Sequence, residues 1–130
     1  MVRQRSRDTV PEVAVRRRLH ATGVRYRVHA KLEPDLRVRG DIVWGGLKIV
    51  VFIDGCYWHG CPIHATAPKA NAAWWRQKLD ENIARDRRTD AVLTSRDWRV
   101  LRFWEHEEPD AVVMTIRNEL IERRDTHRRG

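Results

Sequence analysis

The chain has 130 residues, 42% of them hydrophobic and 34% charged, with a net charge of +8. This composition excludes a disordered chain, and no apolar run approaches the roughly 20 residues that a membrane span needs. We therefore expect one globular domain over residues 1–130, located in the cytoplasm. The excess of arginine favours a nucleic-acid partner, although a basic surface that serves only solubility is the alternative.

Hydrophobic periodicity and turn residues predict seven elements that follow a short basic arm at residues 1–8. Helices are expected at 9–23, 72–95 and 109–124, and strands at 24–28, 41–44, 47–53 and 98–104. The order α, β, β, β, α, β, α indicates an α/β fold, in which a central mixed β-sheet is flanked by α-helices.

Local residues mark the ends of these elements. Thr9 and Glu12 match a capping box, which gives Glu12 a structural role in the first helical turn. Gly23 is expected to end that helix. Gly45-Gly46, between two runs rich in β-formers, indicates a hairpin with a tight turn.

Both cysteines lie in the loop that follows strand 47–53. The candidate ligands of a structural zinc are Cys56, Cys61, His64 and His106. The fourth candidate comes just after strand 98–104, and both loops leave the same sheet edge if the two strands are neighbours. His59 could replace His64 as a ligand. The alternative is two buried cysteines with surface histidines.

Three acidic residues occupy positions that suggest chemistry. Asp86 falls on the apolar side of helix 72–95, where a carboxylate needs a catalytic role or a partner such as an arginine from another element. Asp41 opens a strand, where a simple cap is the alternative, and Glu12 has the capping role described above. Carboxylates that hold Mg²⁺ beside a general base such as His59 are typical of phosphodiester hydrolysis.

The six tryptophans are many for a domain of this size. Tyr57-Trp58 and Trp74-Trp75 are adjacent pairs, so one ring of each pair must face away from the other. On a basic protein, outward rings can stack on bases or wedge into a duplex. Packing around the zinc loop explains the same rings equally well.

Together the motifs resemble the very short patch repair (Vsr-type) DNA mismatch endonucleases over about residues 7–106. The matching segments are Arg7-Asp8-Thr9-x-Pro11-Glu12, Arg39-x-Asp41, Val51-Phe52-x-Asp54-Gly55-Cys56-Tyr57-Trp58-His59-Gly60-Cys61-Pro62-x-His64, Asn82-x-x-Arg85-Asp86 and Trp98-x-Val100-x-x-x-Trp104-Glu105-His106. The central segment is highly specific, whereas the others are weak alone.

The resemblance implies a restriction-endonuclease-like fold that nicks one DNA strand beside a T:G mismatch left by deamination of 5-methylcytosine. It implies that Asp41 and the backbone carbonyl of Ile53 bind Mg²⁺, that His59 is the general base, and that Asp86 holds or polarises this histidine. Glu12 falls on an acidic position near the site. The implied zinc ligands are Cys56, Cys61, His64 and His106, and the implied DNA contacts are Tyr57, Trp58, Trp75 and Thr9.

Three features depart from the family pattern. The zinc set is arranged Cys-x4-Cys-x2-His and not with a central histidine. Asp54 stands where the best-studied pattern has a histidine, so it is expected to be an extra metal ligand or a proton acceptor in catalysis. The arm before the first helix is short, which weakens the expected clamping of DNA.

Three hypotheses follow for a monomeric protein that binds duplex DNA. The first is repair at T:G mismatches, with mismatch-repair proteins as candidate further partners. The second is a restriction or nicking endonuclease of the same fold with another substrate. The third is a zinc-dependent DNA-binding module without catalysis.

Overall fold

The computed structural model describes residues 10–55 and 72–129. The elements in these ranges are α1 (Val10–Ala21), β1 (Arg27–Lys31), β2 (Arg39–Trp44), β3 (Ile49–Asp54), α3 (Ala72–Ser95), β4 (Arg99–Trp104) and α4 (Pro109–Arg129). No helix within the described ranges is long and apolar enough to cross a membrane.

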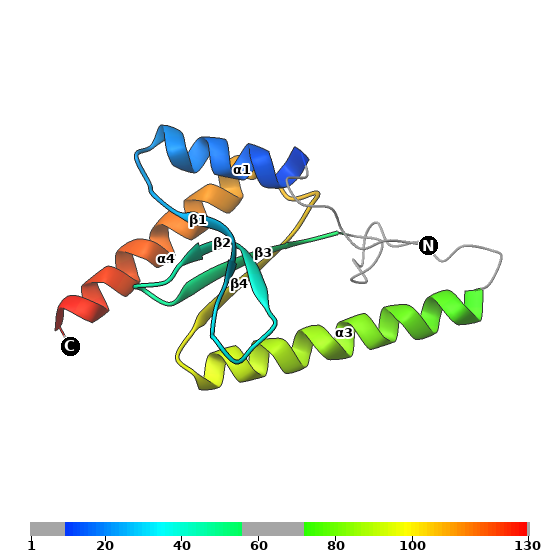
Figure 1. Ribbon diagram of the computed structural model, residues 1–130. Coiled ribbons are helices and arrows are strands. Elements are labelled where there is room, and N and C mark those ends of the chain that lie inside the picture. Colours follow the sequence, from blue (N-terminus) through cyan, green and yellow to red (C-terminus); the bar gives the residue numbers. More distant parts are fainter. Residues whose placement is uncertain (1–9, 56–71, 130) are drawn as a thin grey trace.

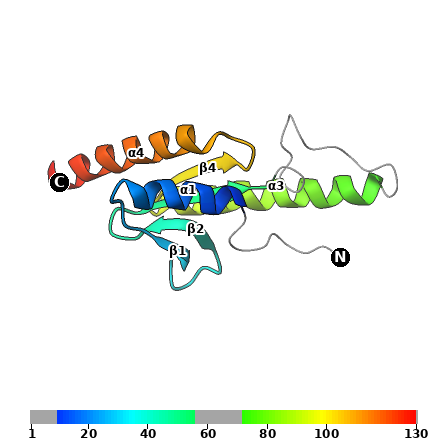
Figure 2. The same ribbon diagram turned by 90° about the horizontal axis from the view of Figure 1, so that it is seen from above.

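The four described strands form one mixed sheet in the order β1-β2-β3-β4. β2 pairs antiparallel with β1 and with β3, whereas β4 runs parallel to β3. The helices α1 and α3 lie on opposite sides of this sheet (Figure 1), and Figure 2 shows α1 over the middle of the sheet and α4 along the β4 edge. The α/β architecture with a mixed sheet is therefore confirmed.

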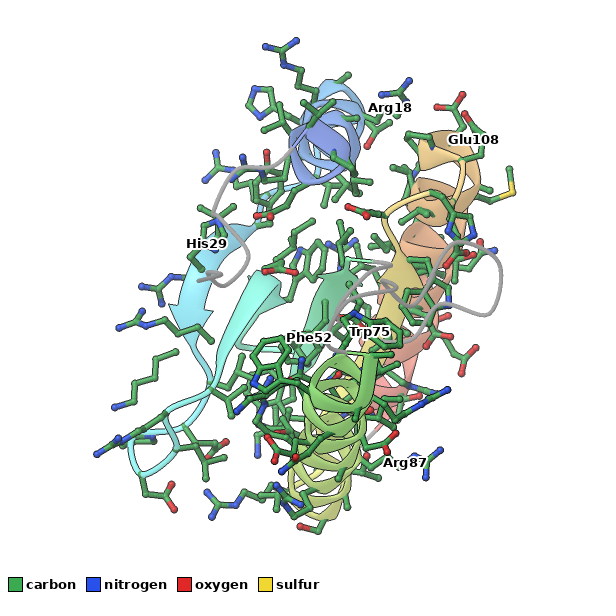
Figure 3. The ribbon with its side chains drawn as sticks, turned by 90° about the vertical axis from the view of Figure 1, so that its right-hand side faces the viewer. Arg18, His29, Phe52, Trp75, Arg87 and Glu108 are labelled. Carbon is green, nitrogen blue, oxygen red and sulfur yellow. The ribbon has the colours of Figure 1, made fainter. Side chains whose placement is uncertain are left out.

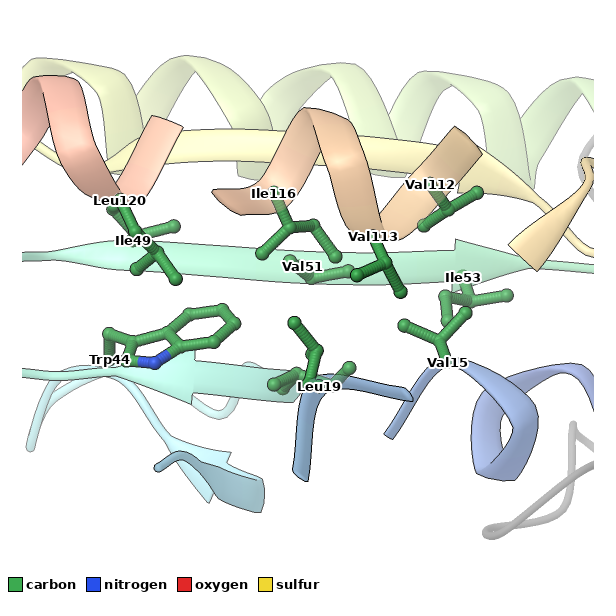
Figure 4. Close-up of a cluster of buried hydrophobic side chains, with 11 residues drawn as sticks. Val15, Leu19, Trp44, Ile49, Val51, Ile53, Val112, Val113, Ile116 and Leu120 are labelled. Atoms are coloured by element: carbon green, nitrogen blue, oxygen red, sulfur yellow. The ribbon is translucent and has the colours of Figure 1, made fainter. Parts of the chain in front are cut away.

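One core lies between the sheet and the pair α1 and α4. Val15 and Leu19 of α1 face Val51 and Ile53 of β3, and Ile116 of α4 completes the contact (Figure 4). All five side chains are buried. Because α1 and α4 both pack against this face of the sheet, the end of β3 that carries Ile53 is fixed in position.

A second core lies on the α3 side of the sheet. Val43, Val50 and Phe52 pack there with Leu93 of α3 and Trp98. A side chain at Gly40 would collide with Val50 and approach Cγ2 of Val43 within 2.7 Å, so glycine is required where β2 begins.

Most of the predicted elements agree with the structure. The range 72–95 predicted for α3 is confirmed, and the hairpin turns at Gly45-Gly46 with Lys48 N–H donating to the Gly45 carbonyl. The strand predicted at 24–28 is wrong in position, because β1 begins at Arg27. Val24 N–H donates instead to the carbonyl of Leu19 and closes the end of α1, where Gly23 has φ of +84°.

The last helix is longer than predicted. It continues to residue 129 instead of ending near 124, because polar turns extend it past Leu120, the end of its buried apolar side. The predicted capping box pairs Thr9 with Glu12, and Thr9 lies outside the described residues.

Candidate active site

The carboxyl end of β3 positions the candidate site. The backbone N–H of Ile53 donates to Oδ2 of Asp41 at 2.7 Å, which holds this carboxylate against β3 from the neighbouring strand. Asp41 is only 3% exposed. The next residue of β3, Asp54, begins a second group of charged side chains on the β4 side of the same strand end.

Asp41 lies in a group with Glu12 and His29. One ligand atom from each of the three side chains falls within 4.8 Å of the other two. Nε2 of His29 lies 2.9 Å from Oε2 of Glu12, and the exposed fractions of these side chains are 10% and 0%. Two buried carboxylates this close are costly unless a nearby cation, a shared proton or hydrogen bonds compensate their charge.

Three elements meet in this group. Glu12 comes from the first turn of α1, His29 from β1 and Asp41 from β2. In the sheet, Val28 pairs with Ile42 and Ala30 with Gly40, so His29 stands opposite Asp41. The predicted catalytic position of Glu12 is thus close to Asp41, and its side chain reaches β1 as well as forming part of the first helical turn.

Arg102 is the centre of the second group. Its guanidinium donates to both carboxylate oxygens of Asp54 at 3.1 Å and to Asp90 at 2.7–2.9 Å. Asp86 lies 4.0 Å from the same guanidinium. The cation also lies over the ring of Phe52, 4.3 Å from its centroid. One arginine from β4 therefore links three carboxylates from β3 and α3.

The electrostatics of this group favour the charged arginine. Burial lowers the pKa of Arg102, but the hydrogen bond to Asp90 and the charges of Asp54 and Asp86 outweigh it, so the net shift raises the pKa. A buried cation is stable here because hydrogen bonds and three carboxylates replace the water that it has lost.

Asp86 and Asp54 both lie beside Arg102. Asp86 is not a member of the group formed by Glu12, His29 and Asp41, and the alternative of an arginine from another element describes its surroundings. Asp54 accepts hydrogen bonds from Arg102, and its predicted role as an extra metal ligand or a proton acceptor stays a prediction. His59 lies outside the described residues, so the predicted contact between His59 and Asp86 stays a prediction.

The zinc ligands are described only in part. Cys56, Cys61 and His64 lie outside the described residues, and His106 is exposed in the segment after β4. The parallel pairing of β3 and β4 matches Asp54 with Trp104. The strands that precede the two ligand-bearing segments are therefore neighbours, as the prediction required.

The aromatic pair at the start of α3 divides between core and surface. Trp75 is 3% exposed, whereas Trp74 is 49% exposed. Figure 3 shows that Trp75 and Phe52 both lie on the α3 side of the sheet. The helix turns the two side chains apart, so Trp74 is the exposed ring of the pair, and the predicted contact of Trp75 with DNA stays a prediction. Tyr57, Trp58 and Thr9 lie outside the described residues.

Sequence reasoning missed two residues of the site. His29 was missed because the strand was placed three residues too early, and its register against Asp41 depends on the fold of three strands. Arg102 gave a signal that was available, since a charged residue interrupts the otherwise apolar run Val100 to Trp104. Such an arginine indicates carboxylate partners on neighbouring elements.

Comparison with known proteins relates this chain to endonucleases. Residues 1–64 match the family model described as DNA mismatch endonuclease Vsr. The type II nicking enzyme V.NaeI of Lentzea aerocolonigenes is 44% identical over 119 residues, which cover 89% of this chain and 72% of the relative. The type II nicking enzyme V.XorIIP of Xanthomonas oryzae pv. oryzae is 41% identical, with 90% and 85% covered. The DNA mismatch endonuclease Vsr of Escherichia coli K12 is 33% identical, with 77% and 63% covered.

Proposed function

Because this chain belongs to the Vsr family of DNA endonucleases, we propose that it nicks one strand of a DNA duplex beside a T:G mismatch. The observation that carries the proposal is the buried group of Glu12, His29 and Asp41 at the end of β3. The four-stranded mixed sheet between helices is consistent with the restriction-endonuclease-like fold of such enzymes. The substrate would arise by deamination of 5-methylcytosine.

The site suits a divalent cation. Two buried carboxylates supply the hard oxygen ligands that Mg²⁺ prefers, and the bond from Ile53 N–H to Asp41 brings the backbone of Ile53 into the site. Asp41, with the Ile53 carbonyl and Glu12 beside it, would hold the ion. When bound, Mg²⁺ supplies positive charge that offsets the charge developing on the phosphate.

The remaining predicted residues have supporting roles in the proposal. His59 is the general base that takes the proton of the attacking water, and Asp86 holds this histidine. Asp54 acts through Arg102, which binds both of its oxygens and lies close to Asp86. The guanidinium therefore holds both of these acidic side chains, and we regard both as positioning residues.

Exposed cations provide a surface for the DNA backbone. They lie along the sheet edge at β1 and in the segments beside it, namely Arg25, Arg27, Lys31, Arg37 and Arg39. Such charges on an edge strand also prevent edge-to-edge association. Their position next to His29 and the net charge of +8 favour contacts with phosphates near the site.

A second candidate function keeps the chemistry and changes the substrate. Two of the relatives above carry the name type II nicking enzyme. In addition, Asp54 stands at the position of the family's histidine and pairs with Arg102. The alternative function is therefore nicking of another mispaired, methylated or fully paired sequence. In this function Asp41 keeps the role proposed above.

A panel of labelled duplexes tests the proposal. The duplexes share one flanking sequence and differ in a central T:G, T:A or C:G pair, and each is incubated with Mg²⁺ or with EDTA. We expect nicking of the T:G duplex at least about tenfold faster than of the paired duplexes, and none in EDTA. Equal rates on all three would refute mismatch specificity, and the same panel with methylated cytosine would then identify the second function.

We also propose a structural zinc bound by Cys56, Cys61, His64 and His106. Glu105 N–H donates to the carbonyl of Asp54 at 2.9 Å, so the segments leading to the first and last of these ligands leave the sheet side by side. This proximity supports a shared ion.

Metal analysis tests the zinc proposal. The purified protein should hold one zinc per chain, and His106→Ala should weaken zinc binding at least about tenfold because it removes one of four ligands. The exposed His20→Gln serves as a control. A chelator-treated protein with an unchanged melting temperature would count against a structural zinc.

A further inference from the structure

The group at the end of β3 contains a residue with no assigned role. Glu12 and Asp41 offer oxygen, but His29 offers an imidazole nitrogen within the same 4.8 Å. We propose that His29 is a third protein ligand of the divalent cation, and that its nitrogen makes the site bind Mn²⁺ more tightly than Mg²⁺. This inference deepens the proposed function, since it concerns the cation of the same site.

The distances suit three ligands of one ion. Adjacent ligands of an octahedral ion with bonds of 2.0–2.1 Å lie about 2.9 Å apart, and opposite ligands lie about 4.2 Å apart. Nε2 of His29 and Oε2 of Glu12 are separated by 2.9 Å, the spacing of adjacent ligands. All three ligand atoms lie within 4.8 Å of one another, so at most a small inward movement of the side chains brings them to these spacings when an ion binds.

The backbone at His29 is strained in a way that serves this geometry. Its φ is +48°, in the left-handed region, although it lies within β1 between residues that pair regularly with β2. The Arg39 side chain donates to the His29 carbonyl at 3.0 Å and so satisfies it outside the ladder. Figure 3 shows His29 on β1, toward α1. Strain of this kind persists where the surrounding structure holds a side chain for a purpose.

The nature of the ligand set determines the metal preference. Mg²⁺ is hard and favours oxygen, whereas imidazole nitrogen suits transition metals. Two carboxylates and one imidazole therefore favour Mn²⁺ over Mg²⁺ in a way that an all-oxygen set does not. The competing account makes His29 a protonated counter-ion of Glu12, and a positive charge there would repel any cation.

Calorimetric titration of the full chain with Mn²⁺ and with Mg²⁺, without DNA, separates the two accounts. We expect the wild type to bind Mn²⁺ at least about tenfold more tightly than Mg²⁺. His29→Gln places an oxygen near the position of Nε2, and should remove most of this preference while Mg²⁺ binding persists. Unchanged or increased Mn²⁺ affinity in His29→Gln would overturn the proposal, as would equal affinities in the wild type.

Two further variants and one spectroscopic measurement keep the result clear. His20→Gln changes an exposed histidine of α1 and should leave both affinities unaltered. His29→Asn is the second variant, because asparagine tolerates positive φ but is too short to reach the ion. Pulsed electron paramagnetic resonance of Mn²⁺-loaded protein should show a nitrogen coupling that both His29 variants lose, and a wild-type spectrum without it would contradict ligation by His29. Because no DNA is present, failure of T:G nicking leaves this result standing.

Discussion

Replacing Asp41 by asparagine should slow DNA nicking at least about a thousandfold, a loss of roughly 4 kcal/mol in transition-state stabilisation. Asp41 is buried and accepts the hydrogen bond of Ile53 N–H at 2.7 Å. Asparagine retains an acceptor oxygen of nearly the same shape, so the strand contact survives. The variant removes the negative charge that the proposed cation would require, and therefore separates chemistry from folding.

Three measurements on Asp41→Asn make the result interpretable. Nicking of the T:G duplex should be lost, whereas the melting temperature and duplex binding, followed by fluorescence anisotropy, should remain close to wild type. Asp125→Asn, which changes an exposed carboxylate of α4, is the matched control with the same loss of charge. If Asp41→Asn nicks within tenfold of wild type, then Asp41 is not a ligand of the catalytic ion.

Local sequence signals were sufficient for the elements that position this site. The apolar side of α3 and the capping and turn residues predicted its bounds, and Gly45-Gly46 predicted the hairpin that brings Asp41 beside β3. The shared zinc site required strands 47–53 and 98–104 to be neighbours, and β3 and β4 are paired in the sheet. For α3 and the hairpin, residues close in the chain carry the information.

Contacts between distant elements were not predictable in the same way. The alternation of Val24, Tyr26 and Val28 suggested a strand, but Val24 closes the end of α1 and the hydroxyl of Tyr26 donates to the carbonyl of Arg16. The residues that follow form β1 instead, and only this shift places His29 opposite Asp41. A sequence shows that Asp86 lies on an apolar helix side, but not that its neighbour is an arginine 16 positions later.

Arg102→Leu is expected to lower the free energy of unfolding by about 3 kcal/mol. The guanidinium is mostly buried, with 22% of its side chain exposed, and it faces Asp54, Asp86 and Asp90 at once. Leucine preserves packing against Phe52 but leaves three carboxylates close together without a cation. Removal of one partner from a buried charged group costs more than the whole group contributes, because the remaining charges lose their compensation.

The same strand offers a matched control. Arg99 lies on β4 and contacts Glu119 at 3.2 Å and Glu122 at 3.3 Å, but it is 42% exposed. Arg99→Leu should therefore cost less than about 1 kcal/mol, because water screens exposed ion pairs. Denaturant unfolding of both variants, with identical slopes, gives the comparison directly.

A double-mutant cycle with Asp90→Asn shows whether charge is the cause. In the wild type, Asp90→Asn removes a partner of Arg102 at 2.7 Å and should be destabilising. In the Arg102→Leu background the same change removes an uncompensated charge and should be stabilising. This reversal of sign is expected only if the guanidinium balances the carboxylates. Equal effects of Asp90→Asn in both backgrounds, or a cost of Arg102→Leu no larger than that of Arg99→Leu, would mean that Arg102 acts through packing alone and does not position Asp54 and Asp86 by charge.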